Sequence, residues 1–230
     1  MLLALLLFVQ DPEALLRKPE EILAGAKTIS VTFKSDGVFS QGGKENEGHY
    51  AASWRTKGAN LFRIDTTDYR GKPYWIASDG KTVTNSSGVE PQAALKDSNA
   101  RMALVFARMG GQSYMSLSIS NPDREKIDNK KECYFPDLRL LIKWSGAKHL
   151  GTEKLDGREA HKVAATATWR KRGEESDSTA DVVTWLDAES GLPLKRTVHH
   201  EVGAWKSDIV ETYRDWKLNA EIADDVFTKP

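Results

Sequence analysis

Five histidines are the residues of this chain best suited to acid–base catalysis or metal binding near neutral pH. His199 and His200 are adjacent, so on a β-strand their side chains point to opposite faces and cannot bind one metal ion without distortion. His49, His149 and His161 stand alone, with no cysteine or second histidine at the spacing of metal ligands. Each histidine is therefore interpreted as a surface or strand residue, and neither a metal site nor a cofactor is expected.

Nucleophiles are equally sparse. The single cysteine, Cys133, has no histidine near it in sequence, which favours a structural or incidental thiol. Residues 111–115 contain half of the Gly-x-Ser-x-Gly pattern of a serine nucleophile but lack its second glycine. Asp187 and Glu189 lie in a predicted turn, where acidic side chains more often accept backbone hydrogen bonds than act in catalysis. The sequence therefore favours a binding protein over an enzyme.

The charges of the chain are balanced, with 33 lysines and arginines against 33 aspartates and glutamates. Nucleic acid or an anionic membrane as an obligatory partner would need a concentrated basic patch, so neither is expected. A length of 230 residues suits a single all-β domain with one sizeable core. We expect that domain to be a monomer.

The first ten residues resemble an export signal. An apolar run from Met1 to Val9 is too short to span a bilayer, which needs about 20 apolar residues. Its length and position match the apolar region of a signal peptide, although no lysine or arginine precedes it. We predict an export signal at residues 1–10, one domain at residues 11–230, and a soluble product in the periplasm or otherwise exported. A buried N-terminal segment is the alternative.

The secondary-structure elements that would position these residues are predicted to be mostly β-strands. Between Trp54 and Val83 hydrophobic residues alternate in the pattern of a β-meander, with Asp79-Gly80 as a hairpin turn. Hydrophobic side chains occur there at both odd and even positions, so both faces of the sheet carry them. A second hydrophobic face needs a cover, which is either a set of helices or a ligand.

The same patterns predict the other elements. Two short helical pieces, separated at Pro19, precede a strand around residues 29–33 and a strand around residues 50–54. A helix is expected at residues 97–109, followed by a long irregular link at residues 112–136. An antiparallel ladder then follows, with strands at residues 138–144, 160–169, 182–186, 192–200 and 205–216.

Three motifs in this order resemble the LolA-like family of periplasmic carriers of outer-membrane lipoproteins. They are residues 57–63 (Lys-Gly-Ala-Asn-Leu-Phe-Arg), residues 78–82 (Ser-Asp-Gly-Lys-Thr) and residues 185–193, with Phe227 and a terminal proline after them. The resemblance covers roughly residues 14–83 and 182–230. It implies an incomplete antiparallel β-barrel, or half-barrel, that is mostly β with a few helices and has residues 97–109 in a helical lid.

The chain departs from the LolA-like carriers at the arginine that helps to gate their cavity. The carriers have an arginine directly before their Pro-Asn-Leu-Phe motif, whereas Gly58 and Ala59 precede Asn60 here. The nearest cation is Lys57, and lysine does not replace a planar, bidentate arginine.

The leading hypothesis is a soluble exported protein that binds acyl chains of lipids or lipoproteins in a hydrophobic half-barrel. An interaction or sensor module of the cell envelope, holding a partner protein, is the second hypothesis. An enzyme is the third, and His161 or His199 would then be the first residues to mutate. The expected hydrophobic lining, for which plain core packing is the alternative, is Tyr50, Trp54, Phe62, Ile64, Tyr74, Ile76, Met102, Phe106 and Trp185.

Overall fold

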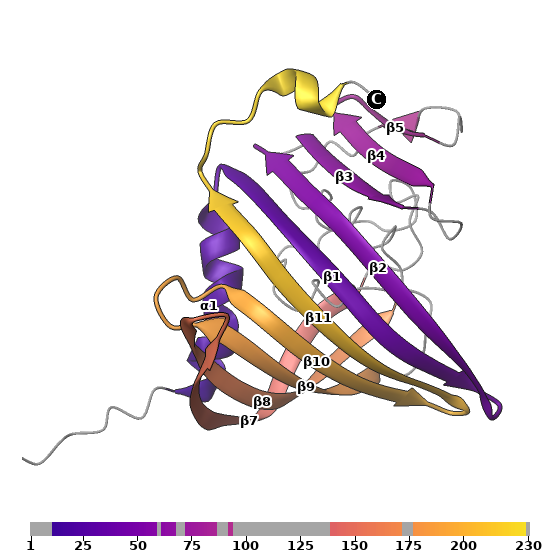
Figure 1. The fold of residues 1–230 in the computed structure, drawn as a ribbon, viewed down its shortest axis with the longest axis vertical. Helices are drawn as coiled ribbons and strands as arrows, with labels where there is room; N and C mark the ends of the chain where they lie inside the picture. Colours follow the sequence, from indigo (N-terminus) through magenta and orange to yellow (C-terminus); the bar gives the residue numbers. More distant parts are fainter. Residues whose placement is uncertain are drawn as a thin grey trace, which may run out of the picture.

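The described residues form one antiparallel sheet of 11 strands, in the order β6-β5-β4-β3-β2-β1-β11-β10-β9-β8-β7 (Figure 1). This computed structural model describes residues 11–58, 61–67, 72–86, 92–93, 139–171 and 177–228. The strands of the N-terminal half are β1 (Thr28–Gln41), β2 (Lys44–Lys57), β3 (Leu61–Thr67), β4 (Pro73–Asp79), β5 (Thr82–Asn85) and β6 (Gln92–Ala93). The C-terminal half contains β7 (Arg139–Leu155), β8 (Arg158–Lys171), β9 (Ser178–Asp187), β10 (Pro193–Val202) and β11 (Trp205–Leu218). One α-helix, α1 (Pro12–Gly25), precedes the sheet, and a short 3-10 helix, η4 (Asp224–Phe227), follows it.

Two-residue turns fix the register of the long hairpins. Gly42 and Gly43 join β1 to β2 with φ angles of 59° and 80°, a left-handed geometry that glycine adopts without steric cost. Asp156 and Gly157 join β7 to β8 in the same way, with φ angles of 50° and 82°. Because such turns match the twist of the flanking strands, these hairpins extend much further than the hydrophobic runs alone predict.

The first and last long strands join the two halves of the sheet. β1 pairs with β2 on one side and with β11 on the other, so Phe33 lies between Ala52 and Tyr213. The predicted strands after residue 138 are confirmed as β7 to β11. The pairing of β1 with β11 places the N-terminal meander and the C-terminal ladder in one continuous surface.

Helix α1 is a single helix, so the prediction of two pieces separated at Pro19 is wrong. Asp11 caps its first turn, because the Asp11 carboxylate accepts a hydrogen bond of 3.0 Å from the Glu13 backbone N–H. Pro19 cannot donate a backbone hydrogen bond inside the helix, which costs about 3 kcal/mol. Burial of Leu15, Leu16 and Leu23 contributes about 1.5–3 kcal/mol for each side chain, and this outweighs the cost of the proline.

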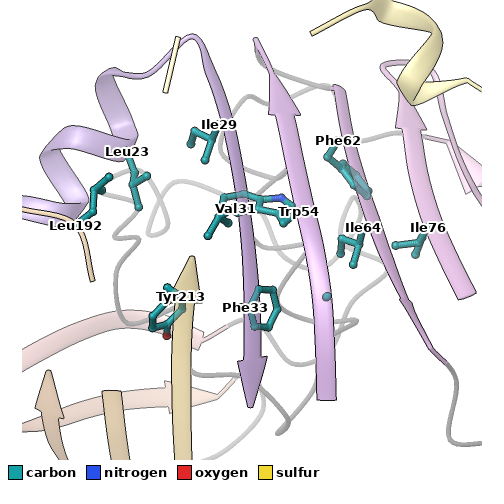
Figure 2. Packing of buried hydrophobic residues seen from close by; sticks show 11 residues of the cluster. Leu23, Ile29, Val31, Phe33, Trp54, Phe62, Ile64, Ile76, Leu192 and Tyr213 are labelled. Atoms are coloured by element: carbon teal, nitrogen blue, oxygen red, sulfur yellow. The ribbon is translucent and has the colours of Figure 1, made fainter. Parts of the chain in front are cut away.

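The face of the sheet against which α1 lies is called the inner face. Leu15 and Leu16 pack against Val163, Ala165 and Leu186 of β8 and β9. Leu23, at the other end of α1, belongs to the larger cluster on β1 to β4 shown in Figure 2. The helix therefore contributes to the hydrophobic core of both halves of the sheet.

The mostly-β fold class is confirmed. The sheet is open, because β6 and β7 stand at opposite ends of the strand order and the described residues show no pairing between them. In Figure 1 the sheet is twisted and curved, with α1 against one face. The predicted lid helix at residues 97–109 lies outside the described residues.

The outer face carries the C-terminal segment. The Lys57 Nζ donates a 2.8 Å hydrogen bond to the Ile222 carbonyl and lies 2.6 Å from the Asp224 carboxylate. Arg63 donates a 3.2 Å hydrogen bond to the Val226 carbonyl, and Phe227 is buried. Lys57 is the cation nearest to the position where the LolA-like carriers have an arginine. Here it anchors the C-terminal segment to the sheet.

Candidate functional site

Six of the predicted lining residues lie on the inner face, next to one another. Trp54, Ile64 and Ile76 form one cross-strand row over β2, β3 and β4, because each residue is paired with the next in the strand register. Strand alternation places the other three on the same face. Figure 2 shows Trp54, Phe62, Ile64 and Ile76 on neighbouring strands of this wall. The complete set of six is Tyr50, Trp54, Phe62, Ile64, Tyr74 and Ile76.

The wall has a fully buried centre and partly exposed aromatic groups at one side. Trp54, Phe62 and Ile64 are buried, whereas Tyr50 and Tyr74 are half-buried. The Tyr50 ring packs on Phe33, with ring centroids 5.8 Å apart. Burial raises the pKa of the Tyr50 hydroxyl, so this group stays protonated at physiological pH. The wall is therefore apolar, with the uncharged Tyr50 hydroxyl at one side.

Two further predicted residues, Met102 and Phe106, lie outside the described residues. The ninth, Trp185, is placed on the opposite face, so its prediction as part of the same lining is wrong. Thr184 and Leu186, its neighbours on β9, point inward, and strand alternation therefore directs Trp185 outward. Its ring lies between the ammonium groups of Lys162 and Lys195, each 4.8 Å from the ring centroid.

A row of polar residues crosses the inner face beside the apolar wall. Successive register partners place Ser35, Glu211, Arg196 and Thr184 side by side on β1, β11, β10 and β9. Their exposed fractions are 4%, 0%, 2% and 1%, respectively. We call these four residues the polar row. It was not predicted from the sequence, and it contains one buried positive and one buried negative side chain.

Hydrogen bonds connect the polar row to the apolar wall through Tyr213. Arg196 donates one hydrogen bond of 3.2 Å to the Thr184 hydroxyl and one of 3.3 Å to the Tyr213 hydroxyl. The Tyr213 hydroxyl in turn donates to the Glu211 carboxylate. Burial, above all, raises the pKa of Tyr213 well above its usual value. Because Tyr213 also packs in the cluster of Phe33 and Trp54, the charged pair and the apolar wall share one surface.

The next row of the inner face is apolar. Val182, Val198 and Ile209 are register partners on β9, β10 and β11, and all three are buried. In the row after that, Ser207 lies opposite His200. The Ser207 hydroxyl has no hydrogen-bond partner within the described part of the chain. The inner face of β9 to β11 thus alternates between polar and apolar rows.

Comparisons with known proteins give structural similarity at low sequence identity. No protein-family model matches the chain, and no curated protein sequence matches it. Among solved structures, it is similar to a LolA superfamily protein from Nitrosomonas europaea, at 13% identity and a TM-score of 0.43, over 95% of this chain and 97% of that one. The lipoprotein LppX from Mycobacterium tuberculosis is similar at 14% identity and a TM-score of 0.46, over 94% and 100%. LprF from Mycobacterium bovis is similar at 9% identity and a TM-score of 0.49, over 92% and 94%.

The first of these structures is described as a LolA superfamily protein, the superfamily whose motifs the sequence resembles. Because all three TM-scores are below 0.5, the function proposed below rests on the contacts of this chain and not on those neighbours.

The outer face has a groove of about 820 Å³ that spans β1, β2 and β7 to β11. Two histidine–aspartate pairs line it. His49 Nδ1 lies 2.7 Å from the Asp36 carboxylate, and His199 Nδ1 lies 2.7 Å from the Asp208 carboxylate. In each pair the hydrogen bond to the carboxylate raises the pKa of the histidine. Val38 and Val210 provide exposed apolar contacts in the same groove.

The histidines and the acidic turn are placed as the sequence predicts. His199 is exposed and His200 is buried, so the two point to opposite faces. Asp187 accepts a 2.6 Å hydrogen bond from the Ser190 backbone N–H and lies 2.8 Å from Arg158. Burial alone would raise the pKa of Asp187, but the contacts to Ser190 and Arg158 outweigh it and lower that pKa.

Two kinds of feature are absent from the described residues. These residues contain no group of three or more histidine, cysteine or acidic side chains that could hold a metal ion. Within the same part of the chain, no helix has both the length and the apolar character needed to cross a membrane.

Proposed function

We propose that this protein binds the acyl chains of lipids or lipoproteins against the apolar inner wall of its sheet. The observation that supports this most strongly is the wall itself. Six hydrophobic side chains from β2, β3 and β4 lie on one face, in register, on the same side as α1. An acyl chain packed against such a wall gains about 25 cal/mol for each Å² of apolar surface removed from water. A role as an exported carrier or binding protein follows from this interaction together with the apolar leader at residues 1–10.

Fluorescence of the neutral apolar dye N-phenylnaphthylamine tests this proposal, because the dye becomes bright when it enters an apolar site. The wild-type protein is expected to bind the dye saturably. Tyr50→Glu introduces a charge beside the wall at a half-buried position, and we expect it to weaken dye binding about tenfold or more.

Ala51→Glu is the matched control, because it adds the same charge one residue later, at an exposed position on the outer face. This variant should bind the dye as the wild type does. Equal losses in the two variants, or no saturable binding to the wild type, would contradict the proposal.

The outer groove favours a second candidate function, an interaction module of the cell envelope. Its exposed valines and acidic side chains form a surface that a partner protein could contact. A photo-crosslinking residue at Val210 would capture such a partner in cells, whereas the same residue at Lys44, in the β1–β2 hairpin, would not. Crosslinking of one defined partner from Val210 together with absent dye binding would favour the module over the lipid-binding protein.

A further inference from the structure

The outer groove combines negative charge with exposed apolar side chains. We infer that it binds a basic segment of a partner protein, in which lysine or arginine side chains occur together with aliphatic ones. This inference rests on the second candidate function and adds the chemistry of the partner to it. It does not depend on acyl-chain binding at the inner wall, which lies on the opposite face of the sheet.

The groove is negatively charged although the chain as a whole is neutral. Among the described residues that line it, Lys148 is opposed by four carboxylates. All four are exposed, so a partner reaches them without displacing side chains of the core. A basic segment that contacts them is both attracted to the groove and oriented in it. The four carboxylates belong to Asp36, Glu47, Asp181 and Asp208.

The groove also presents apolar side chains. Four large hydrophobic residues of the described chain are exposed, and two of them, Val38 and Val210, line this groove. Strand register continues the surface across β10, β9 and β8, where the successive partners of Val210 are Thr197, Val183 and Ala164. A partner that covers these side chains gains about 25 cal/mol for each Å² of apolar surface removed from water. The groove therefore favours a cation that also carries aliphatic groups.

The length of the groove suits a short stretch of polypeptide. It crosses seven neighbouring strands, from β2 through β1, β11, β10, β9 and β8 to β7. Neighbouring strands lie about 4.8 Å apart, so this width of sheet is about 29 Å. An extended peptide rises about 3.3 Å per residue, and about nine residues therefore match it.

Two histidines make the charge of the groove depend on pH. Hydrogen bonds to the nearest carboxylates raise the pKa values of His49 and His199 above the ordinary 6.5. Protonation of both rings adds two positive charges to the groove, so a basic segment should bind more weakly at acid pH. The carboxylates facing the rings are Asp36 at 2.7 Å and Glu47 at 3.9 Å from His49, and Asp208 at 2.7 Å and Glu201 at 3.9 Å from His199, with Asp181 of β9 also acting on His199.

Fluorescence anisotropy with labelled nine-residue peptides tests the inference. The basic probe has three repeats of Lys-Val-Val, and the acidic probe has three repeats of Glu-Val-Val. At about pH 8.5, where both histidines are largely neutral, the wild-type protein should bind the basic probe about tenfold or more tightly than the acidic one. Equal affinities, or no binding of the basic probe, would overturn the inference.

A third probe, with three repeats of Lys-Ser-Ser, separates this site from general attraction of cations. It should bind about tenfold more weakly than the lysine–valine probe, because it covers the valines of the groove without aliphatic contacts. Equal binding of the two basic probes would overturn the inference.

Removal of charge from the groove supplies a second test. Asp181→Asn combined with Asp208→Asn should weaken binding of the lysine–valine probe about tenfold. Glu189→Gln combined with Glu221→Gln is the matched control, because it removes the same charge from exposed positions outside the groove. The control should bind as the wild type does. Equal losses in the two double variants would overturn the inference.

The histidines are tested by the pH dependence of the same binding. The wild-type affinity for the lysine–valine probe should fall about tenfold between about pH 8.5 and about pH 5.5, while the lysines of the probe stay charged. His49→Gln combined with His199→Gln should abolish this fall. His161→Gln, on the inner face, is the control and should preserve it. A fall that persists in the double variant would contradict the role of the two histidines.

The assays separate this inference from the functions proposed above. Binding of N-phenylnaphthylamine without binding of the basic probe would overturn the inference and leave the lipid-binding proposal intact. A partner crosslinked from Val210 through an acidic segment would overturn it and leave the second candidate function intact. Thermal melts of the variants confirm that each is folded before its affinity is compared.

Discussion

Arg196 of β10 and Glu211 of β11 lie directly opposite each other on the inner face, and both side chains are buried. The same two strands pair Val198 with Ile209 in the adjacent row. A charged pair and an aliphatic pair thus occupy equivalent positions of one hairpin.

Breaking the pair should cost more stability than replacing it. Arg196→Met leaves Glu211 buried without its cross-strand cation, and we expect a loss of about 3–5 kcal/mol in the free energy of unfolding. The double variant Arg196→Met with Glu211→Leu should recover much of that loss, because neither buried charge of these two register partners remains. Urea denaturation of the two single variants and the double variant measures the coupling. Additive losses would show that the two side chains act independently.

Gly48 should not tolerate even a methyl group. A Cβ at this position would lie 2.7 Å from Cε2 of the Phe39 ring, which itself packs against Trp205. We therefore expect Gly48→Ala to lower the free energy of unfolding by about 1–3 kcal/mol. Gly25→Ala is the control, because a Cβ there meets no atom within 4 Å. A thermal melt in which both variants match the wild type would contradict this packing.

Three histidines should titrate at different pH values. Hydrogen bonds to Asp36 and Asp208 raise the pKa values of His49 and His199 above the ordinary 6.5. Burial, with help from His149 and Lys18, lowers the pKa of His161 below it. An NMR titration of the ring protons should therefore show His161 losing its proton first as pH rises, with His49 and His199 following.

The direction of the stability change follows from these pKa shifts. The stabilisation from protonated His49 and His199 is fully present below pH 6.5 and is lost as pH rises through their raised pKa values. Asp36→Asn and Asp208→Asn should each return the paired histidine toward 6.5. Raised pKa values that persist in these variants would mean that another group causes them.

Lys57 should hold the C-terminal segment on the sheet. Lys57→Met removes its hydrogen bond to Ile222 and its ion pair with Asp224, and we expect a loss of about 1 kcal/mol in the free energy of unfolding. Hydrogen exchange at residues 220–228 should become faster in this variant. Lys34→Met, at an exposed position of β1, is the control and should leave that exchange unchanged. Unchanged exchange in both variants would show that Lys57 does not retain the segment.

The sequence predicts the strands and the apolar wall well because both depend on local alternation. Phe62 and Ile64 lie two residues apart on β3, so their shared face follows from strand geometry alone. The gap between the predicted strands at residues 192–200 and 205–216 likewise contains the turn of the β10–β11 hairpin. The continuous helix α1 was not predicted from local pattern, because tertiary packing of its leucines outweighs the local penalty of Pro19.

The polar row was missed because its strands are polar on both faces. Along residues 195–200, Arg196 and His200 alternate with Lys195 and His199, and composition does not say which pair is buried. The pairing of β1 with β11, which brings Ser35 beside Glu211, joins positions far apart in the chain. Extending the register from the turn after Val202 would have placed Arg196 opposite Glu211, and that was the usable signal. Trp185 was misassigned for a similar reason, since large aromatic residues stabilise either face of this sheet.

Binding of acyl chains to the inner wall can be tested directly on the purified protein. Protein prepared without detergent can be extracted with organic solvent, and the extract can be analysed by mass spectrometry for co-purified lipid. We expect acyl lipid in the wild-type extract, in clear excess over the extract of Tyr50→Glu prepared in the same way. Lipid-free wild-type protein that also fails to bind N-phenylnaphthylamine would contradict it.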